Sequence, residues 1–254
     1  MDLGLADRVY IVTGASKGLG RACAQLLIDE GARLVIAARD HDALTETARQ
    51  LGRPENVIAV AADIQDPETP AQLVAAAAGR FNRLDGSIIS VGGPPAGSAM
   101  DITDAQWLSS FDTVFLGAVR TARAVVRGMS SEGGSLLFVL SSSVKSPIPG
   151  LAVSNGLRPG LAMVAKTLAD ELGPRAIRVN AVLPGRIDTD RVRELDEATG
   201  DPHAAEQAFL TQIPLGRYGE ASEFARPAVV MLSPAASYVT GTVLPIDGGM
   251  LRTL

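Results

Sequence analysis

Short runs of apolar residues alternate along the chain with longer stretches whose apolar positions recur at helical spacing. The apolar runs predict strands at residues 9–12, 33–38, 56–61, 86–91, 135–140 and 177–182, with a seventh at 239–245. The stretches between them predict helices at residues 21–30, 42–51, 70–81, 104–129 and 156–172. Continuously apolar strands that alternate with helices are typical of a parallel sheet covered on both faces. The pattern therefore predicts a single α/β domain over residues 1–254, with a doubly wound parallel sheet of about seven strands.

One segment interrupts this alternation. Residues 184–219 are polar and rich in charged side chains, and they follow the last central strand. They leave the sheet at its carboxyl edge, where such sheets bind ligands. A long insertion there is often a lid, and the alternative is a solvated excursion with no part in the chemistry. We expect a substrate loop or lid near residues 186–219.

The composition restricts the class of protein. Of the 254 residues, 46% are hydrophobic and 20% are charged, and the formal net charge is −5. This is the composition of a soluble globular domain. Because there is no basic block, we expect neither a nucleic acid nor an anionic membrane as a partner. Because no run of about 18 apolar residues occurs, we expect no membrane span.

The few cysteines and histidines bear on compartment and metal content. Cys23 is the single cysteine, which excludes an internal disulfide framework and favours a reducing compartment. The first residues lack the basic start and apolar run of a secretory leader, so we expect a cytoplasmic protein. Two histidines far apart, His41 and His203, make a zinc site improbable, and we expect no metal.

A glycine-rich turn joins the first predicted strand to the first predicted helix. Residues 13–20 read TGASKGLG. Glycine permits backbone conformations that a Cβ disfavours, and it lets a diphosphate approach the main chain. The helix start adds free N–H groups and the positive end of the helix dipole. The alternative is an ordinary strand-to-helix turn. We expect a dinucleotide diphosphate to be held here by Gly14, Ser16, Lys17, Gly18, Leu19 and Gly20.

The pattern Thr-Gly-x-x-x-Gly-x-Gly resembles the cofactor loop of short-chain dehydrogenases/reductases. Later segments also resemble that family: RVNAVLPGRIDT at 178–189, PLGRYGE at 214–220, SYVTG at 237–241 and DGG at 247–249. Together they extend over nearly the whole chain in the family's order. The resemblance implies a Rossmann-like fold and further cofactor contacts from Asp63, Ile64, Gly92, Arg158, Pro184, Gly185, Ile187 and Thr189.

The end of the second strand predicts which dinucleotide binds. Small residues at 37 and 38 are followed by Arg39, where an acid would bind the ribose 2′-hydroxyl of NAD. A guanidinium suits the 2′-phosphate of NADP, and Lys17 is able to add a second positive charge. The neighbouring Asp40 argues for NAD. We expect NADP, with NAD less favoured.

The catalytic positions depart from the family's pattern. The resemblance implies a tyrosine acid/base, a lysine four residues later, a serine about 13 residues before the tyrosine and a helix asparagine. Here these positions hold Ser154, Arg158, Ser141 and Val114. A serine hydroxyl is too weak an acid to replace the tyrosine, although it still donates a hydrogen bond. Substitute proton donors or water-orienting groups are Lys145, Asn155, His203 and Tyr218, and Ser142 or Ser143 replaces Ser141 if the loop is shifted.

Three functions remain open from the sequence. The first is an NADP-dependent oxidoreductase that acts on a small polar or acyl-type carbonyl or alcohol with an altered proton relay. The second is a dinucleotide-binding protein without turnover, a sensor or an assembly subunit. The third is a non-redox lyase or isomerase. The resemblance also implies a homo-oligomer, a tetramer or a dimer, that packs helices 104–129 and 156–172.

Overall fold

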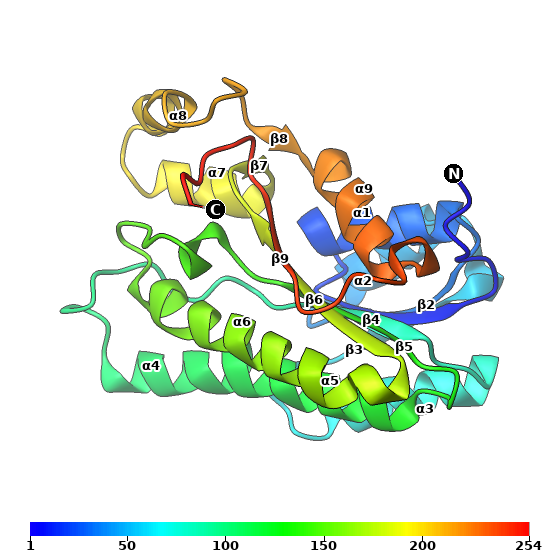
Figure 1. Ribbon diagram of the computed structural model, residues 1–254. Helices are drawn as coiled ribbons and strands as arrows, with labels where there is room; N and C mark the ends of the chain where they lie inside the picture. Colours follow the sequence, from blue (N-terminus) through cyan, green and yellow to red (C-terminus); the bar gives the residue numbers. More distant parts are fainter. Residues whose placement is uncertain (254) are drawn as a thin grey trace.

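All seven strands of the central sheet are parallel (Figure 1). Their order across the sheet is β3-β2-β1-β4-β5-β6-β9, so β2 and β3 lie on one side of β1, and β4 and the later strands lie on the other. The computed structural model describes residues 1–253. The strands are β1 (Val9–Thr13), β2 (Arg33–Ala38), β3 (Val57–Ala61), β4 (Gly86–Ser90), β5 (Gly134–Val139), β6 (Ile177–Pro184) and β9 (Val243–Ile246). The predicted doubly wound α/β fold with seven strands is therefore confirmed.

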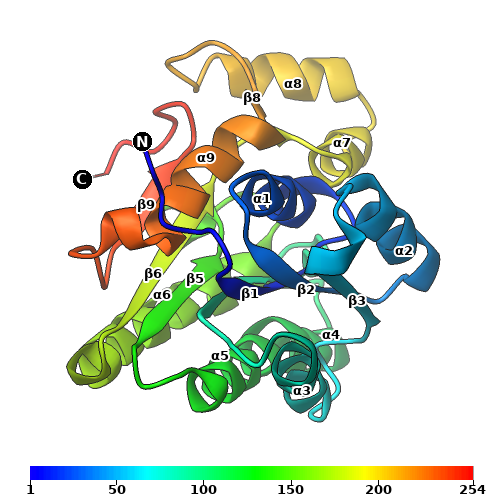
Figure 2. The ribbon, with the colours of Figure 1, turned by 90° about the vertical axis from the view of Figure 1, so that its right-hand side faces the viewer.

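Helices cover both faces of this sheet (Figure 2). One face carries α1 (Gly18–Asp29), α2 (His41–Gln50) and α9 (Ala221–Leu232), and the other carries α3 (Thr69–Phe81), α4 (Asp104–Ser110), α5 (Gly117–Gly128) and α6 (Ala152–Leu172). The inner strands β1, β2, β4, β5 and β6 are buried on both sides, so their neighbouring residues enter different cores, whereas the edge strands β3 and β9 are partly exposed. Val12 packs with Leu27 and Phe224 on one face. Ile11 packs with Phe138 and Leu161 on the other. Within residues 1–253, no helix is long and apolar enough to cross a membrane.

Two predicted elements differ in detail from the structure. The single helix predicted at 104–129 contains a π-helical stretch, Phe111–Leu116, between α4 and α5. Apolar positions three to four residues apart suit both kinds of turn, so the periodicity alone does not reveal the wider one. The strand predicted at 239–245 begins only at Val243, because Gly241 has φ of +69°, outside the range for a strand.

The polar segment 186–219 forms two helices and a small ribbon of its own. β7 (Ile187–Asp188) pairs with β8 (Gly219–Glu220), and α7 (Asp190–Glu197) and α8 (Pro202–Leu210) lie between them. In Figure 1 these elements lie beyond the carboxyl ends of the central strands, above the loops that follow β4 and β5. This arrangement places the segment beside the edge at which parallel sheets bind ligands.

Candidate dinucleotide and substrate cavity

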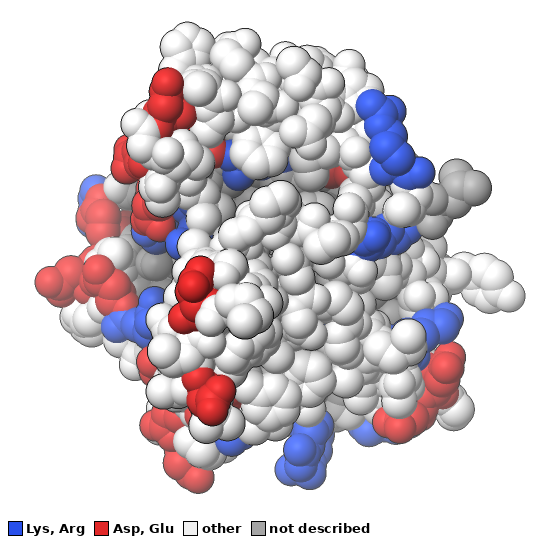
Figure 3. All heavy atoms as spheres, turned by 90° about the vertical axis from the view of Figure 1, so that its left-hand side faces the viewer, with Lys and Arg blue, Asp and Glu red and all other residues white. Residues whose placement is uncertain are grey.

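A cavity of about 650 Å³ opens at the carboxyl edge of the sheet, between the loops after β1, β4, β5 and β6 and the helix α7. Figure 3 shows the side of the molecule toward which these loops and α8 project, and its charged side chains lie mostly around an uncharged centre. Most of the site residues expected from the sequence line this cavity. They are Gly14, Lys17, Gly18, Leu19, Gly20, Arg39, Gly92, Ser141, Ser154, Arg158, Pro184, Gly185, Ile187 and Thr189.

The backbone conformation of the first turn requires glycine at several positions. Gly14 and Gly18 have φ of +63° and +56°, a region that disfavours residues with a side chain. A Cβ on Gly20 would lie 2.3 Å from the Gly14 carbonyl oxygen. The turn is consequently tight, and α1 begins at Gly18 with its first N–H groups free of partners within the helix. This is a cradle that fits a dinucleotide diphosphate.

The side chains after β2 separate into two roles. Arg39 is exposed and lines the cavity. The Asp40 carboxylate accepts a hydrogen bond of 3.0 Å from the Ala43 backbone N–H and so caps the start of α2. The Asp40 carboxylate, which favoured NAD, therefore caps α2, whereas Arg39 faces the cavity.

Lys17 lies at the same end of the cavity. Its side chain is 63% exposed, and its Nζ is 3.9 Å from a carboxylate oxygen of Asp190 and 3.7 Å from one of Glu194. Contacts of this length between exposed groups contribute little to stability. Lys17 thus keeps its charge available to a phosphate at the glycine turn.

Three expected cofactor residues do not line this cavity: Ser16, Asp63 and Ile64. The Ser16 carbonyl accepts a hydrogen bond from the Thr47 hydroxyl, which ties the turn to α2. The Asp63 carboxylate accepts a hydrogen bond of 3.0 Å from the Gln65 backbone N–H. These contacts order the loops around the cavity, and an adenine contact by Asp63 and Ile64 stays a prediction.

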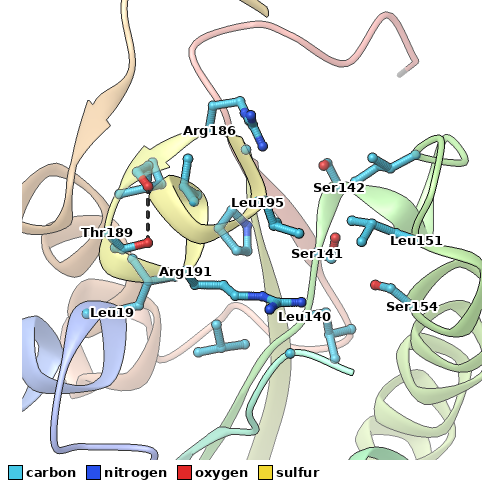
Figure 4. A pocket seen from close by; sticks show the side chains of 18 of the residues that line it. Leu19, Leu140, Ser141, Ser142, Leu151, Ser154, Arg186, Thr189, Arg191 and Leu195 are labelled. Atoms are coloured by element: carbon cyan, nitrogen blue, oxygen red, sulfur yellow. Dashed lines mark hydrogen bonds between the residues drawn. The ribbon is translucent and has the colours of Figure 1, made fainter. Parts of the chain in front are cut away.

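Ser143 joins the turn after β5 to the start of α6. The Ser154 hydroxyl, on the first turn of α6, is 3.0 Å from the Ser143 hydroxyl. The Ser141 hydroxyl accepts a hydrogen bond of 3.1 Å from the Ser143 N–H and caps a short turn. Ser141, Ser142 and Ser154 nevertheless all face the cavity (Figure 4). The sequence had left Ser143 only as an alternative, because three adjacent serines do not show which one faces α6.

Arg158 lies one turn after Ser154 on α6 and is buried. Its guanidinium donates hydrogen bonds of 3.2 and 2.9 Å to the Val139 and Leu140 carbonyl oxygens at the end of β5. Burial, together with the nearby charge of Arg191, lowers its pKa to about 10. The group is still a cation at neutral pH, so it supplies positive charge and cannot act as the proton donor.

The substitute groups weighed from the sequence lie away from the cavity. The Asn155 amide is engaged on both sides, because it accepts from the Ile148 N–H and donates to the Ile148 carbonyl at 3.0 and 2.9 Å. Tyr218 donates to Asp196 at 3.1 Å, and burial raises its pKa. His203 is exposed on the far side of the segment 186–219. Neither these three residues nor Lys145 is among the residues that line the cavity.

One lining residue was missed by the sequence analysis as a site residue. Arg191 extends from the first turn of α7 across the cavity toward the end of β5, near Leu140 (Figure 4). Its Nη2 donates a hydrogen bond of 2.9 Å to the Pro94 carbonyl in the loop after β4. A Cβ on Gly93 would lie 2.6 Å from its Nε, so that glycine makes room for the arginine. The sequence signal that could have identified Arg191 is its position two residues after Thr189, which is one of the expected cofactor residues.

A buried charged cluster holds the segment 186–219 together. Arg186 forms an ion pair with Asp196 of α7, and both side chains are nearly inaccessible to solvent. The Arg186 guanidinium lies 3.6 Å from the centre of the Phe209 ring of α8. Tyr218, which precedes β8, accepts a hydrogen bond of 3.3 Å from Arg186. One arginine therefore connects α7, α8 and the return strand.

The chain is similar to known oxidoreductases over its whole length. Residues 14–251 match the family model described as enoyl-(acyl carrier protein) reductase. An L-rhamnose 1-dehydrogenase (NAD(P)(+)) from Azotobacter vinelandii is 35% identical, with 98% of this chain and 99% of the relative covered. A mouse (Mus musculus) 3-oxoacyl-[acyl-carrier-protein] reductase is 34% identical, with 98% and 100% covered.

Solved structures agree with this similarity. The L-sorbose reductase from Gluconobacter frateurii, in complex with NADPH and L-sorbose, superposes with a TM-score of 0.92 at 32% identity. The whole of both chains is covered. The likeness therefore includes the insertion and the cavity as well as the sheet.

Proposed function

The chain belongs to the short-chain dehydrogenase/reductase family of oxidoreductases, and we propose that it uses NADP(H) to interconvert a carbonyl and an alcohol in this cavity. The observation that supports the proposal most is the arrangement at the end of β2. Arg39 faces the cavity beside the glycine cradle, while Asp40 is engaged in capping α2. A fixed positive charge with a planar fork of donors suits a 2′-phosphate.

The residues that hold the cofactor in this proposal follow the length of the cavity. The turn from Gly14 to Gly20 holds the diphosphate, and Lys17 and Arg39 bind the 2′-phosphate. Pro184, Gly185, Ile187 and Thr189 border the nicotinamide end. When bound, the cofactor supplies the hydride. A relative named as using NAD(P)(+) and a neighbour solved with NADPH are consistent with this assignment.

The chain's own groups polarise the carbonyl and balance its charge. Ser141 accepts a hydrogen bond from the Ser143 N–H, so its own proton is free to be donated to a carbonyl oxygen. Ser154 has the same freedom when Ser143 donates within the 3.0 Å hydroxyl pair. Arg158 and Arg191 add positive charge where an alkoxide develops. Since none of these groups is a suitable acid at neutral pH, water that enters the cavity supplies the proton.

The segment 186–219 acts in this proposal as a lid. It contributes Arg186, Ile187, Thr189 and residues of α7 to the cavity wall. The Arg191–Pro94 hydrogen bond joins it to the loop after β4. A lid in this position limits the water at the reacting groups to the molecules that supply the proton, and it strengthens the electrostatic interactions in the cavity.

Replacing Arg39 by alanine tests the cofactor assignment. We expect Arg39→Ala to weaken NADPH binding by at least about tenfold and to leave NADH binding nearly unchanged, since a charge-assisted phosphate contact is lost. Binding is measured by the fluorescence of the reduced nicotinamide, and the KM for each cofactor is measured with any carbonyl that is turned over. Arg53→Ala, an exposed arginine outside the cavity, is the matched control. An equal loss for both cofactors would show that Arg39 does not bind the 2′-phosphate.

A dinucleotide-binding protein without turnover is the second candidate function. The observation that favours it is the pairing of Ser154 with Ser143 and of Arg158 with two backbone carbonyls, which leaves no acidic donor of the tyrosine type at this end of the cavity. This function predicts tight NADPH binding together with no oxidation of NADPH by any carbonyl. The two functions differ in whether NADPH is oxidised by a carbonyl and not in whether NADPH binds.

Self-association is the last part of the proposal. Leu108 of α4, Phe111 of the π-helical stretch and Met163 of α6 are large apolar side chains exposed to solvent. Exposed apolar groups on adjacent helices favour a contact between copies of the chain. Light scattering should give a mass that is a multiple of 26.3 kDa. A monomer at working concentration contradicts this part of the proposal.

A further inference from the structure

The inner part of the cavity is bordered by two arginines, Arg158 and Arg191. Arg158 is 5% exposed and donates hydrogen bonds only to backbone carbonyls. Within residues 1–253, none of the ion pairs includes Arg158, and the charged neighbour that lowers its pKa is a second cation, Arg191. Two guanidinium groups thus border the same cavity, and the buried one has no carboxylate partner among the described residues.

Two acids, Asp190 and Glu194, line this cavity, and both lie beside Lys17. Glu194 is the acid paired with Arg191, at 3.7 Å, and it is also 3.7 Å from Lys17. Asp190 lies next to Lys17 and forms an ion pair with Arg193. All of these acidic side chains are about half exposed. They lie at the Lys17 end of the cavity, whereas Arg158 lies at the end near Ser154 without an acidic partner among the described residues.

The Arg191 guanidinium has N–H donors available to a ligand in this position. A guanidinium carries five N–H donors, and the hydrogen bond to the Pro94 carbonyl uses one of them. The separation from Glu194, 3.7 Å, is too long for a hydrogen bond. In Figure 4 the guanidinium points toward the end of β5, on the same side of the cavity as Ser141. A planar fork with free donors is the group that best matches the two oxygens of a carboxylate.

The surroundings make such a contact favourable. Leu140, Ile148, Leu151 and Leu195 form apolar parts of the cavity wall. Two like charges in a partly apolar cavity repel each other and are poorly solvated, and an anion between them removes both penalties. The same balance gives little advantage to a neutral ligand of equal shape.

We propose that the substrate carries a carboxylate, which Arg191 binds in the presence of the Arg158 charge, while the reacting carbonyl lies at Ser141 and Ser154. The substrate class is therefore an oxo acid in the reductive direction and a hydroxy acid in the oxidative direction. The reaction depends on the proposed oxidoreductase function, whereas the binding of the acid does not.

The test compares acids with their neutral esters. Acetoacetate, levulinate and benzoylformate, each beside its methyl ester, are titrated by calorimetry into the protein saturated with NADP⁺ and into the protein alone. We expect at least one acid to bind about tenfold more tightly than its ester. This preference should disappear in Arg191→Gln, because the amide cannot supply the charge. Arg193→Gln, on the same helix but outside the cavity, should keep it.

Several outcomes overturn the proposal. The first is that every ester binds as tightly as its acid. The second is that no acid binds. A third is an equal loss for acid and ester in Arg191→Gln, which would make Arg191 only a fastening between α7 and the Pro94 loop. A fourth is a loss of NADP⁺ binding in Arg191→Gln with the acid preference intact, which would make it a cofactor ligand. Failure of the oxidoreductase function is recognised separately, because it appears as NADPH binding without turnover of any carbonyl, whereas acid binding is measured by calorimetry with and without the cofactor.

Discussion

A double replacement, Ser154→Tyr with Arg158→Lys, is expected to raise the rate of carbonyl reduction at least about 100-fold over the unaltered chain. The family resemblance places a tyrosine and a lysine at these positions. A phenol has a pKa near 10, and an adjacent ammonium lowers it toward the working pH. A positioned general acid typically contributes a factor of about 100 or more. The rate is measured as loss of reduced-nicotinamide absorbance with a carbonyl panel.

The change is made at a residue that borders the cavity. Ser154 lines the cavity at the start of α6, so a larger side chain there faces the cavity once the contact with Ser143 is given up. The single variants Ser154→Ala and Arg158→Lys are the controls, and neither is expected to gain activity. If the double variant folds and binds NADPH but is no faster on any carbonyl, proton donation is not what limits this scaffold.

Removing the carboxylate of Asp196 is expected to loosen the whole segment 186–219. Asp196→Ala leaves the buried Arg186 guanidinium without its ion-pair partner and also removes the hydrogen bond from Tyr218. Breaking a buried pair on one side costs about 3 kcal/mol or more. We expect amide hydrogen exchange in α7 and α8 to become at least about 100 times faster, while the sheet keeps its protection.

The matched control for this prediction is an exposed pair in the same segment. Asp188 and Arg193 form an ion pair in which both side chains are more than half exposed. Exposed pairs contribute about 1 kcal/mol at most, so Asp188→Ala should change exchange in α7 and α8 only slightly. Equal effects of the two variants would mean that the Arg186 cluster does not hold the lid together.

The sequence predicted the fold well because every strand is centred on apolar residues, and the five strands between the sheet edges are largely buried. The glycine turn was also predictable, since Gly14, Gly18 and Gly20 are required by backbone conformation and close approach, which are local properties. Element ends were less predictable. α6 begins at Ala152 rather than at 156, and its N-cap residue Leu151 makes no side-chain hydrogen bond that would mark the start.

The contents of the cavity were less predictable because they depend on contacts between distant segments. Arg191 reaches the Pro94 loop nearly a hundred residues earlier in the chain, and its place two residues after Thr189 is the one local feature that sets it apart from Arg186 and Arg193. The pairing of Ser143 with Ser154 depends on how the turn after β5 meets α6. The exclusion of Asn155 and Tyr218 from the cavity likewise follows from partners that periodicity does not reveal.

The central claim is that this cavity transfers hydride from NADPH to a carbonyl. The most direct measurement follows deuterium from NADPH labelled at the nicotinamide C4 into the product alcohol, by mass spectrometry, over a panel of oxo acids, esters and sugars. We expect deuterium at the carbinol carbon of at least one product, with NADPH preferred over NADH. Saturation of the protein with NADPH, together with no deuterium in any product, would contradict the claim and leave a dinucleotide-binding protein without redox turnover.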